Sequence, residues 1–182
     1  MTITTPRLAA STFFILFFAL AVWACRTVAI TGRQQLNLIP SQTLLSMSYQ
    51  QYGAFLSQAR LSNNQEQTAL VKRVGRRIQA AVEKYFADAG LSEQLRGYAW
   101  EFNLVESPEV NAWCMPGGKV VFYTGILPIT KDEEGLAVVM GHEIAHALRE
   151  HARERISKSV ATGLGVSLAG ALLGVGEAGQ SL

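Results

Sequence analysis

The stretch VVMGHEIAHAL, residues 138–148, decides the fold, because it places two histidines four positions apart with a glutamate directly after the first on an otherwise uncharged segment. Acidic residues precede this stretch at 132–134, and arginines follow it up to Arg155, which is the charge distribution that favours a helix. The pattern therefore predicts one helix over residues 132–155, with an apolar centre that suits a buried position.

The three polar residues of this stretch form the pattern H-E-x-x-H. Positions four apart lie about 40° apart around a helix and about 6 Å along it, so the imidazoles of His142 and His146 can reach one metal ion. Glu143 lies where it can accept the proton of an attacking water. We predict one zinc ion held by His142 and His146, with Glu143 as the catalytic base. The alternative is that both histidines are satisfied core residues of an amphipathic helix.

The third ligand of a catalytic zinc site, which usually has three, is left open by the sequence. His151 would lie about 180° around the same helix from His142 and is predicted to face away. Glu150 lies about 12 Å along the helix from His142, which is beyond the reach of the same ion. Glu177 is the only acid after Glu154, and it is either a third ligand or an exposed carboxylate in the C-terminal tail.

The residues upstream of the motif read as a mixture of helix and strand. Apolar residues recur at steps of three and four over 63–90, which predicts a long amphipathic helix, and helical patterning already starts at Ser41. Residues 98–104 alternate apolar and polar, which predicts a strand. The turn Pro116-Gly117-Gly118 between 112–115 and 120–123 predicts a hairpin or a pair of short strands. The fold class predicted is α+β and mainly helical.

Composition excludes several classes of protein. The 182 residues have a net charge of +2 with 16% charged and 49% hydrophobic residues, whereas about 25% charged residues is typical of a soluble domain. Lysine and arginine are scattered among the acids, so no basic stripe for nucleic acid is present and no nucleic-acid partner is expected. Only two cysteines, Cys25 and Cys114, rule out a disulfide scaffold.

The N-terminus has the layout of a secretory signal, with Arg7 before an apolar run over 8–24. The sequence VWAC at 22–25 resembles a bacterial lipobox, so we predict removal of residues 1–24, lipidation of Cys25 and a tether over 25–40. The predicted protein is periplasmic and attached to a membrane through its lipid, with the outer membrane favoured by Arg26. An uncleaved transmembrane anchor and simple secretion are the alternatives.

The C-terminal stretch over 159–176 is uncharged and rich in glycine. Its length is at the short end for a membrane span, and glycine weakens an isolated helix. A segment that packs over the metal helix or lies at a membrane interface is therefore favoured over true insertion into the membrane.

Three segments together carry a resemblance to a known family: NAWCMPGG at 111–118, VVFYTG at 120–125 and GHEIAHAL at 141–148. They resemble the zinc metalloendopeptidases of the CAAX prenyl protease and HtpX group, in particular the periplasmic BepA-type lipoprotein branch. The resemblance covers residues 31–155. It implies a zincin-like fold of the gluzincin type, in which His142 and His146 bind zinc and Glu143 is the catalytic base.

The same resemblance implies a class of substrate and a third zinc ligand that lies further along the family's sequence. Unfolded or stalled envelope proteins would be the substrates, held as extended chains by backbone pairing with an edge strand. The implied substrate-binding residues are Asn111, Ala112, Pro116, Gly117 and Gly118. The family's third ligand is a glutamate on a later helix, so we expect a metallopeptidase domain over 41–182 that is incomplete at its C-terminus. A catalytically inactive zinc-binding or chaperone-like module is the alternative.

Overall fold

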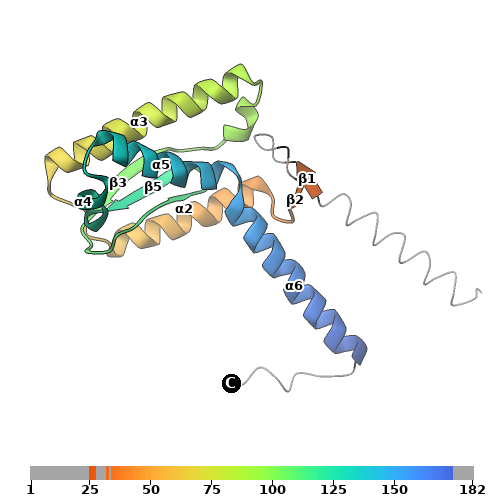
Figure 1. Cartoon of the computed structure of the whole chain (residues 1–182). Coiled ribbons are helices and arrows are strands. Elements are labelled where there is room, and N and C mark those ends of the chain that lie inside the picture. The colour runs from red at the N-terminus through yellow and green to blue at the C-terminus, as the bar shows by residue number, and fades with distance from the viewer. Residues whose placement is uncertain (1–24, 28–31, 33, 174–182) are drawn as a thin grey trace, which may run out of the picture. The chain divides into compact units, whose positions relative to one another are not determined.

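The computed structural model describes residues 25–27, 32 and 34–173 of the chain. The chain divides into two compact units, one formed by residues 39–152 and the other by residues 1–38 together with 153–182. The unit over 39–152 contains the predicted zinc-binding pair, and it is the mainly helical α+β unit that the sequence predicted (Figure 1).

A three-stranded sheet lies at the centre of this unit. Its strands are β3 (Glu101–Val105), β4 (Ala112–Met115) and β5 (Lys119–Tyr123), in the order β3-β5-β4. β3 runs parallel to β5, whereas β4 runs antiparallel to β5 and forms the hairpin that the sequence predicted. Among the described strands β4 pairs only with β5, so it forms one edge of the sheet.

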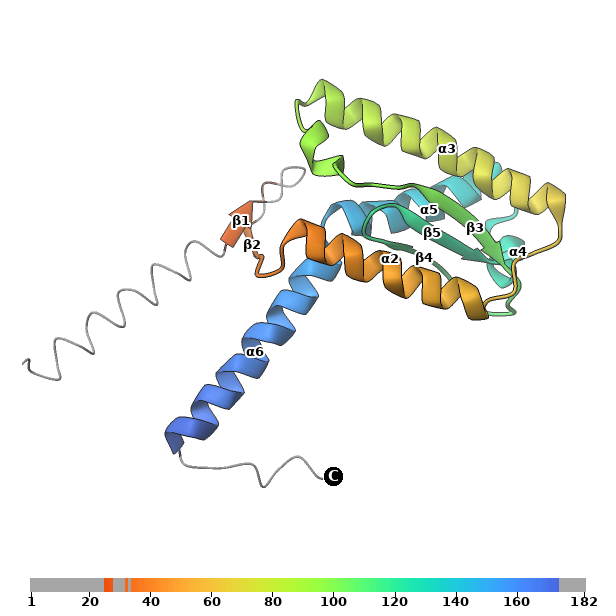
Figure 2. The ribbon, with the colours of Figure 1, turned by 180° about the vertical axis from the view of Figure 1, so that it is seen from behind.

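Helices cover both faces of the sheet (Figure 2). Successive side chains of a strand point to opposite faces. Val120 and Phe122 accordingly pack in a cluster with α3 (Gln65–Asp88) and α5 (Glu133–Leu148), while Val121 packs with α2 (Ser41–Gln58) on the other face. The core therefore has two layers. The helix α5, which carries His142, Glu143 and His146 and is called the motif helix below, lies in the layer with α3.

Helix α3 confirms the helix that the sequence predicted over 63–90. It starts where the side chain of Asn64 accepts a hydrogen bond from the backbone nitrogen of Gln67 at 3.0 Å, which satisfies one of the free amide groups at a helix start. Gly75 lets this helix approach the sheet, since a Cβ there would lie 2.3 Å from the ring of Phe102. A short 3-10 turn, η1 (Ser92–Leu95), leads from α3 to β3.

The motif helix begins after two short elements, η2 (Thr124–Ile126) and α4 (Leu127–Thr130). Asp132 caps it by accepting a hydrogen bond from the backbone nitrogen of Gly135 at 2.8 Å. The prediction of one helix over 132–155 is wrong, because α5 ends at Leu148 and α6 (His151–Leu173) begins after a break. Glu150 has a φ of 56°, a value rare for residues other than glycine. A helix end with a positive φ is usually marked by glycine or asparagine, and because neither stands here, the sequence does not indicate the break.

The unit formed by 1–38 and 153–182 has described structure where the sequence predicted an irregular tether. β1 (Cys25–Thr27) pairs antiparallel with β2 (Gln34–Leu36). Ser157 of α6 is buried, and its hydroxyl accepts a hydrogen bond from the backbone nitrogen of Leu38 at 3.0 Å. Among the described residues, no helix has both the length and the apolar character needed to span a membrane.

Several predictions fall outside the described residues. The signal peptide predicted over 1–24 and the carboxylate of Glu177 belong to this part of the chain. The backbone of Cys25 opens β1, and lipidation of its side chain stays a prediction. The domain boundaries predicted at residues 24 and 40 stay predictions as well.

Candidate metal centre

His142 and His146 lie on the exposed face of α5, because Met140, Ile144 and Ala147 bury the opposite face in the core. The Nε2 atoms of the two histidines are 2.9 Å apart. Their rings stand nearly perpendicular, with centroids 4.5 Å apart. The spacing of four residues thus brings the two imidazoles together through the same nitrogen. Their binding of one zinc ion stays a prediction.

The donor atoms fit two positions of a tetrahedral zinc site. Two nitrogen ligands at about 2.05 Å from zinc are about 3.3 Å from each other in tetrahedral geometry, and the observed 2.9 Å is close to that value. Neutral imidazole is also a preferred ligand of zinc. Within the part of the chain that the structure describes, no group of three or more histidine, cysteine or acidic side chains could hold a metal ion.

The negative charge of Glu143 acts on the edge strand of the sheet. Burial is the main reason why the pKa of Cys114 is raised to about 12, and the negative charge of Glu143 raises it further. Cys114 belongs to β4, and its side chain packs against the core cluster that contains α5 residues. The predicted base therefore lies beside the edge strand. The Cys114 thiol stays protonated near neutral pH, and a protonated thiol is a poor nucleophile.

The predicted substrate-binding residues lie on β4 and at its two ends. Ala112 opens the strand, and the carbonyl of Asn111 accepts a hydrogen bond from the backbone nitrogen of Tyr123 at 3.1 Å. Pro116, Gly117 and Gly118 form the turn from β4 to β5. Both glycines have left-handed φ values, of 88° and 80°, which this turn requires.

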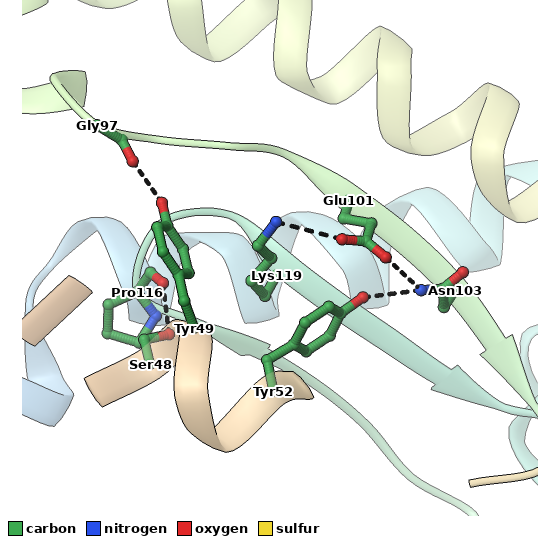
Figure 3. A network of polar contacts seen from close by, with 8 residues as sticks. All are labelled: Ser48, Tyr49, Tyr52, Gly97, Glu101, Asn103, Pro116 and Lys119. Atoms are coloured by element: carbon green, nitrogen blue, oxygen red, sulfur yellow. Dashed lines mark hydrogen bonds and ion pairs between the residues drawn. The ribbon is translucent and has the colours of Figure 1, made fainter. Parts of the chain in front are cut away.

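Helix α2 holds that turn in place (Figure 3). The Ser48 hydroxyl donates a hydrogen bond of 2.7 Å to the carbonyl of Pro116. A Cβ at Gly117 would lie 2.5 Å from the hydroxyl oxygen of Tyr49, so only glycine fits under this ring. The Tyr49 hydroxyl itself donates a hydrogen bond to the carbonyl of Gly97, in the segment before β3. The shape of the strand end beside the motif helix thus depends on α2.

A partly buried lysine connects α2 to the same sheet face (Figure 3). The side chain of Lys119 is only 12% exposed, and its Nζ lies 3.2 Å from an oxygen of Glu101. The ammonium group also lies 5.0 Å from the ring centroid of Tyr49 and 5.5 Å from that of Tyr52. Asn103 donates a hydrogen bond to the Tyr52 hydroxyl at 2.8 Å, and burial raises the pKa of that hydroxyl. The sequence analysis missed this network, because its residues come from three separate segments.

His151 also contacts the motif. Its Nδ1 atom lies 2.8 Å from Nδ1 of His146, with ring centroids 4.9 Å apart. The expectation that His151 faces away is wrong, because it assumed an unbroken helix through residue 150. His151 approaches His146 from the Nδ1 side, whereas His142 lies on the Nε2 side, so His151 is not a further ligand for the same ion.

Two imidazoles that converge next to a carboxylate are the donor set of a metal-dependent hydrolase. The chain belongs to peptidase family M48, whose sequence pattern matches residues 72–181, more than half of its length. It is 34% identical over 149 residues to mitochondrial metalloendopeptidase OMA1 of Schizosaccharomyces pombe, a match that covers 80% of this chain and 41% of the relative. It is 30% identical over 147 residues to metalloendopeptidase OMA1, mitochondrial, of Bos taurus, covering 81% of this chain and 27% of the relative. The chain thus spans less than half the length of these relatives.

A bacterial relative matches over a shorter stretch. The beta-barrel assembly-enhancing protease of Escherichia coli is 36% identical over 52 residues, which is 29% of this chain and 11% of the relative. The predicted periplasmic, membrane-anchored location is wrong, because the relatives that match across most of the chain are mitochondrial proteins. The metalloendopeptidase family that the sequence resembled is confirmed at the level of M48, without its lipoprotein branch.

Proposed function

We propose that this chain supplies the catalytic helix of a zinc-dependent endopeptidase. The observation that carries the proposal is the 2.9 Å separation of the His142 and His146 Nε2 atoms on α5, whose Glu143 lies beside the edge strand. These two histidines would hold one zinc ion, together with a third ligand from outside the described residues. Zinc bound there would polarise a peptide carbonyl and lower the pKa of a water molecule.

Glu143 performs the proton transfers in the proposed reaction. Its carboxylate takes a proton from the attacking water as the oxygen bonds to the carbonyl carbon, and it gives that proton to the leaving amine nitrogen as the C–N bond breaks. Glu143 follows His142 directly, so it lies about 100° around the helix, next to the space in front of the two imidazoles. Cys114 is the nearby thiol, and because its pKa is about 12 it does not compete as a base near neutral pH.

The proposed substrate is an extended stretch of polypeptide. Strand β4 pairs only with β5 among the described strands, and an edge strand can add one further strand through backbone hydrogen bonds. The residues proposed to line this binding edge are Asn111, Ala112, Pro116, Gly117 and Gly118. An unfolded chain offers free backbone groups for such pairing along its whole length, whereas a folded chain offers them mainly at the edges of its sheets. We therefore propose unfolded or stalled proteins as substrates, which is a quality-control role.

A zinc-binding or chaperone-like module without catalysis is a second candidate. It is favoured by the finding that the described residues offer two ligands, whereas catalytic zinc usually has three from the protein. Such a module would bind zinc and extended chains without hydrolysing them.

One experiment tests both candidates on the full chain. Zinc content is measured after incubation with zinc and gel filtration, and cleavage is measured with casein in the presence and absence of a chelator. The variants are His142→Ala, His146→Ala and Glu143→Gln, with Glu134→Gln as a control on an exposed position of the same helix. Chelator-sensitive cleavage that disappears in Glu143→Gln while zinc is retained supports the endopeptidase. Zinc binding without cleavage supports the second candidate, and equal zinc in all variants contradicts both.

A further inference from the structure

The helix breaks between Leu148, where α5 ends, and His151, where α6 begins. The backbone nitrogen of Arg149 donates to the carbonyl of Ala145 at 3.0 Å, and that of Glu150 donates to the carbonyl of Ala147 at 3.1 Å, so the last turn of α5 tightens. Glu150 then takes a left-handed conformation with φ 56°, which is strained for a residue with a side chain. Strained backbone of this kind persists where the surrounding contacts hold it in place.

The break brings two histidine rings together. In an unbroken helix His151 would lie about 140° around the axis from His146, on a different face. In the structure the two Nδ1 atoms are 2.8 Å apart, which is hydrogen-bond distance. His146 therefore lies between two histidines: His151 contacts its Nδ1 atom, and His142 contacts its Nε2 atom.

These two contacts restrict which ring nitrogen of His146 carries the proton. A neutral imidazole has one N–H donor and one acceptor nitrogen, and a metal binds the nitrogen without the proton. The convergent Nε2 atoms of His142 and His146 are the ones placed for zinc, so the proton of His146 must lie on Nδ1. The Nδ1 atom of His151 is then the acceptor, and His151 carries its own proton on Nε2.

We propose that His151 is a positioning residue, which accepts a hydrogen bond from Nδ1–H of His146 and thereby fixes the tautomer and orientation of that ring for zinc. This inference rests on the zinc site proposed above. A second partner that holds a ligating histidine in this way typically strengthens metal binding about 10- to 100-fold.

Matched substitutions at His151 separate the hydrogen bond from simple packing. Asparagine places its side-chain oxygen close to the position of the histidine Nδ1 atom, so His151→Asn keeps an acceptor for His146. Glutamine places its amide close to the position of Nε2 instead, so His151→Gln keeps polarity and size but loses that acceptor. His151→Leu keeps volume only. Thermal unfolding of each full-length variant shows whether the fold is retained.

The first measurement needs no metal. Two-bond nitrogen–proton correlation spectra of the metal-free chain, labelled with 15N-histidine and recorded at pH 8, report which ring nitrogen carries the proton. The His146 signals are assigned by their loss in His146→Ala. We expect the proton on Nδ1 of His146 in the unchanged chain and in His151→Asn, with a shift toward Nε2 in His151→Gln and His151→Leu.

The second measurement is zinc affinity, obtained by competition with a chromophoric chelator. We expect His151→Gln and His151→Leu to bind zinc about 10- to 100-fold more weakly, with His151→Asn close to the unchanged chain. Equal affinity in all four proteins, or a His146 proton on Nε2 in the unchanged chain, overturns the role of His151 and leaves the zinc site standing. An unchanged chain that binds no zinc overturns the zinc site and this inference together.

Discussion

The negative charge of Glu143 on α5 reaches Cys114 on β4, where it adds to the effect of burial in raising the pKa of the thiol. Burial and then the charge of Glu143 raise the pKa of Cys114 to about 12. The charge of the base in the proposed reaction therefore acts on the strand proposed to hold the substrate. The thiol of that strand is protonated near neutral pH, which leaves the carboxylate as the group able to accept a proton.

The pKa of Cys114 predicts how stability changes with pH. Its value of about 12 in the folded chain lies above the ordinary 9.0, so between these pH values the unfolded chain releases a proton that the folded chain retains. The free energy of unfolding therefore falls as pH rises through this range, by at most about 1.4 kcal/mol per pH unit for one group. Urea unfolding at pH 8 and pH 10.5 measures this, and Cys114→Ala should reduce the slope. An unchanged slope in that variant would show that Cys114 is not responsible.

Alanine at Gly75 should destabilise the fold. The added Cβ would lie 2.3 Å from the Phe102 ring, and overpacking of a core typically costs about 1–3 kcal/mol. Gly53 of α2 is the matched control, because no atom lies within 4 Å of a Cβ built there. Gly53→Ala should stabilise the protein by up to about 1 kcal/mol through helix propensity. Chemical denaturation of both variants checks the opposite signs, and a stabilised Gly75→Ala would contradict the close packing of α3 on β3.

Glycine at Lys131 should stabilise the start of the motif helix. Lys131 has φ 65° and ψ −54°, and the backbone nitrogen of Asp132 donates to the carbonyl of Thr130 at 2.7 Å across it. This is a strained turn for a residue with a side chain, and relief of such strain is worth about 1 kcal/mol. Lys131→Gly should thus raise the free energy of unfolding, whereas Lys131→Ala, which retains a Cβ, should not. Equal stability of the two variants would count against strain at this position.

Loss of the Ser48 hydroxyl should loosen the turn at the end of β4. Ser48 is buried, and its hydrogen bond to the carbonyl of Pro116 is 2.7 Å long. Ser48→Ala should cost about 1–2 kcal/mol and increase hydrogen exchange in the turn over 116–118. Ser57→Ala is the control, since the Ser57 hydroxyl bonds only locally to Ala54 near the exposed end of the same helix. Exchange in the turn that is the same in both variants would contradict the proposed anchoring by α2.

Local patterns in the sequence predicted much of this fold. The helix α3 follows from apolar steps of three and four residues, and the shared face of His142 and His146 follows from their spacing of four. The hairpin of β4 and β5 follows from the turn Pro116-Gly117-Gly118. Such repeats are visible in a single sequence because they depend only on neighbours within that element. The chemistry of the motif was predicted for the same reason.

Two features could not be predicted in this way. Glu150 adopts a positive φ without glycine or asparagine, so the helix break and the contact of His151 with His146 leave no mark in the sequence. The position of Lys119 between the rings of Tyr49 and Tyr52 depends on the docking of α2 onto the sheet. Both follow from tertiary contacts, which override local preference.

The sequence separation between residues in contact affects the order in which those contacts form during folding. His142 and His146 are four residues apart, so the two imidazoles converge as soon as one helical turn forms. The turn at the end of β4 is held by the hydrogen bond between Ser48 and Pro116, which are 68 residues apart in the sequence. Contacts that close long loops form more slowly than local ones. When the full-length chain refolds from the unfolded state, the two histidines would be in place before the edge strand is shaped to receive a polypeptide, so metal capture would precede the ability to cut.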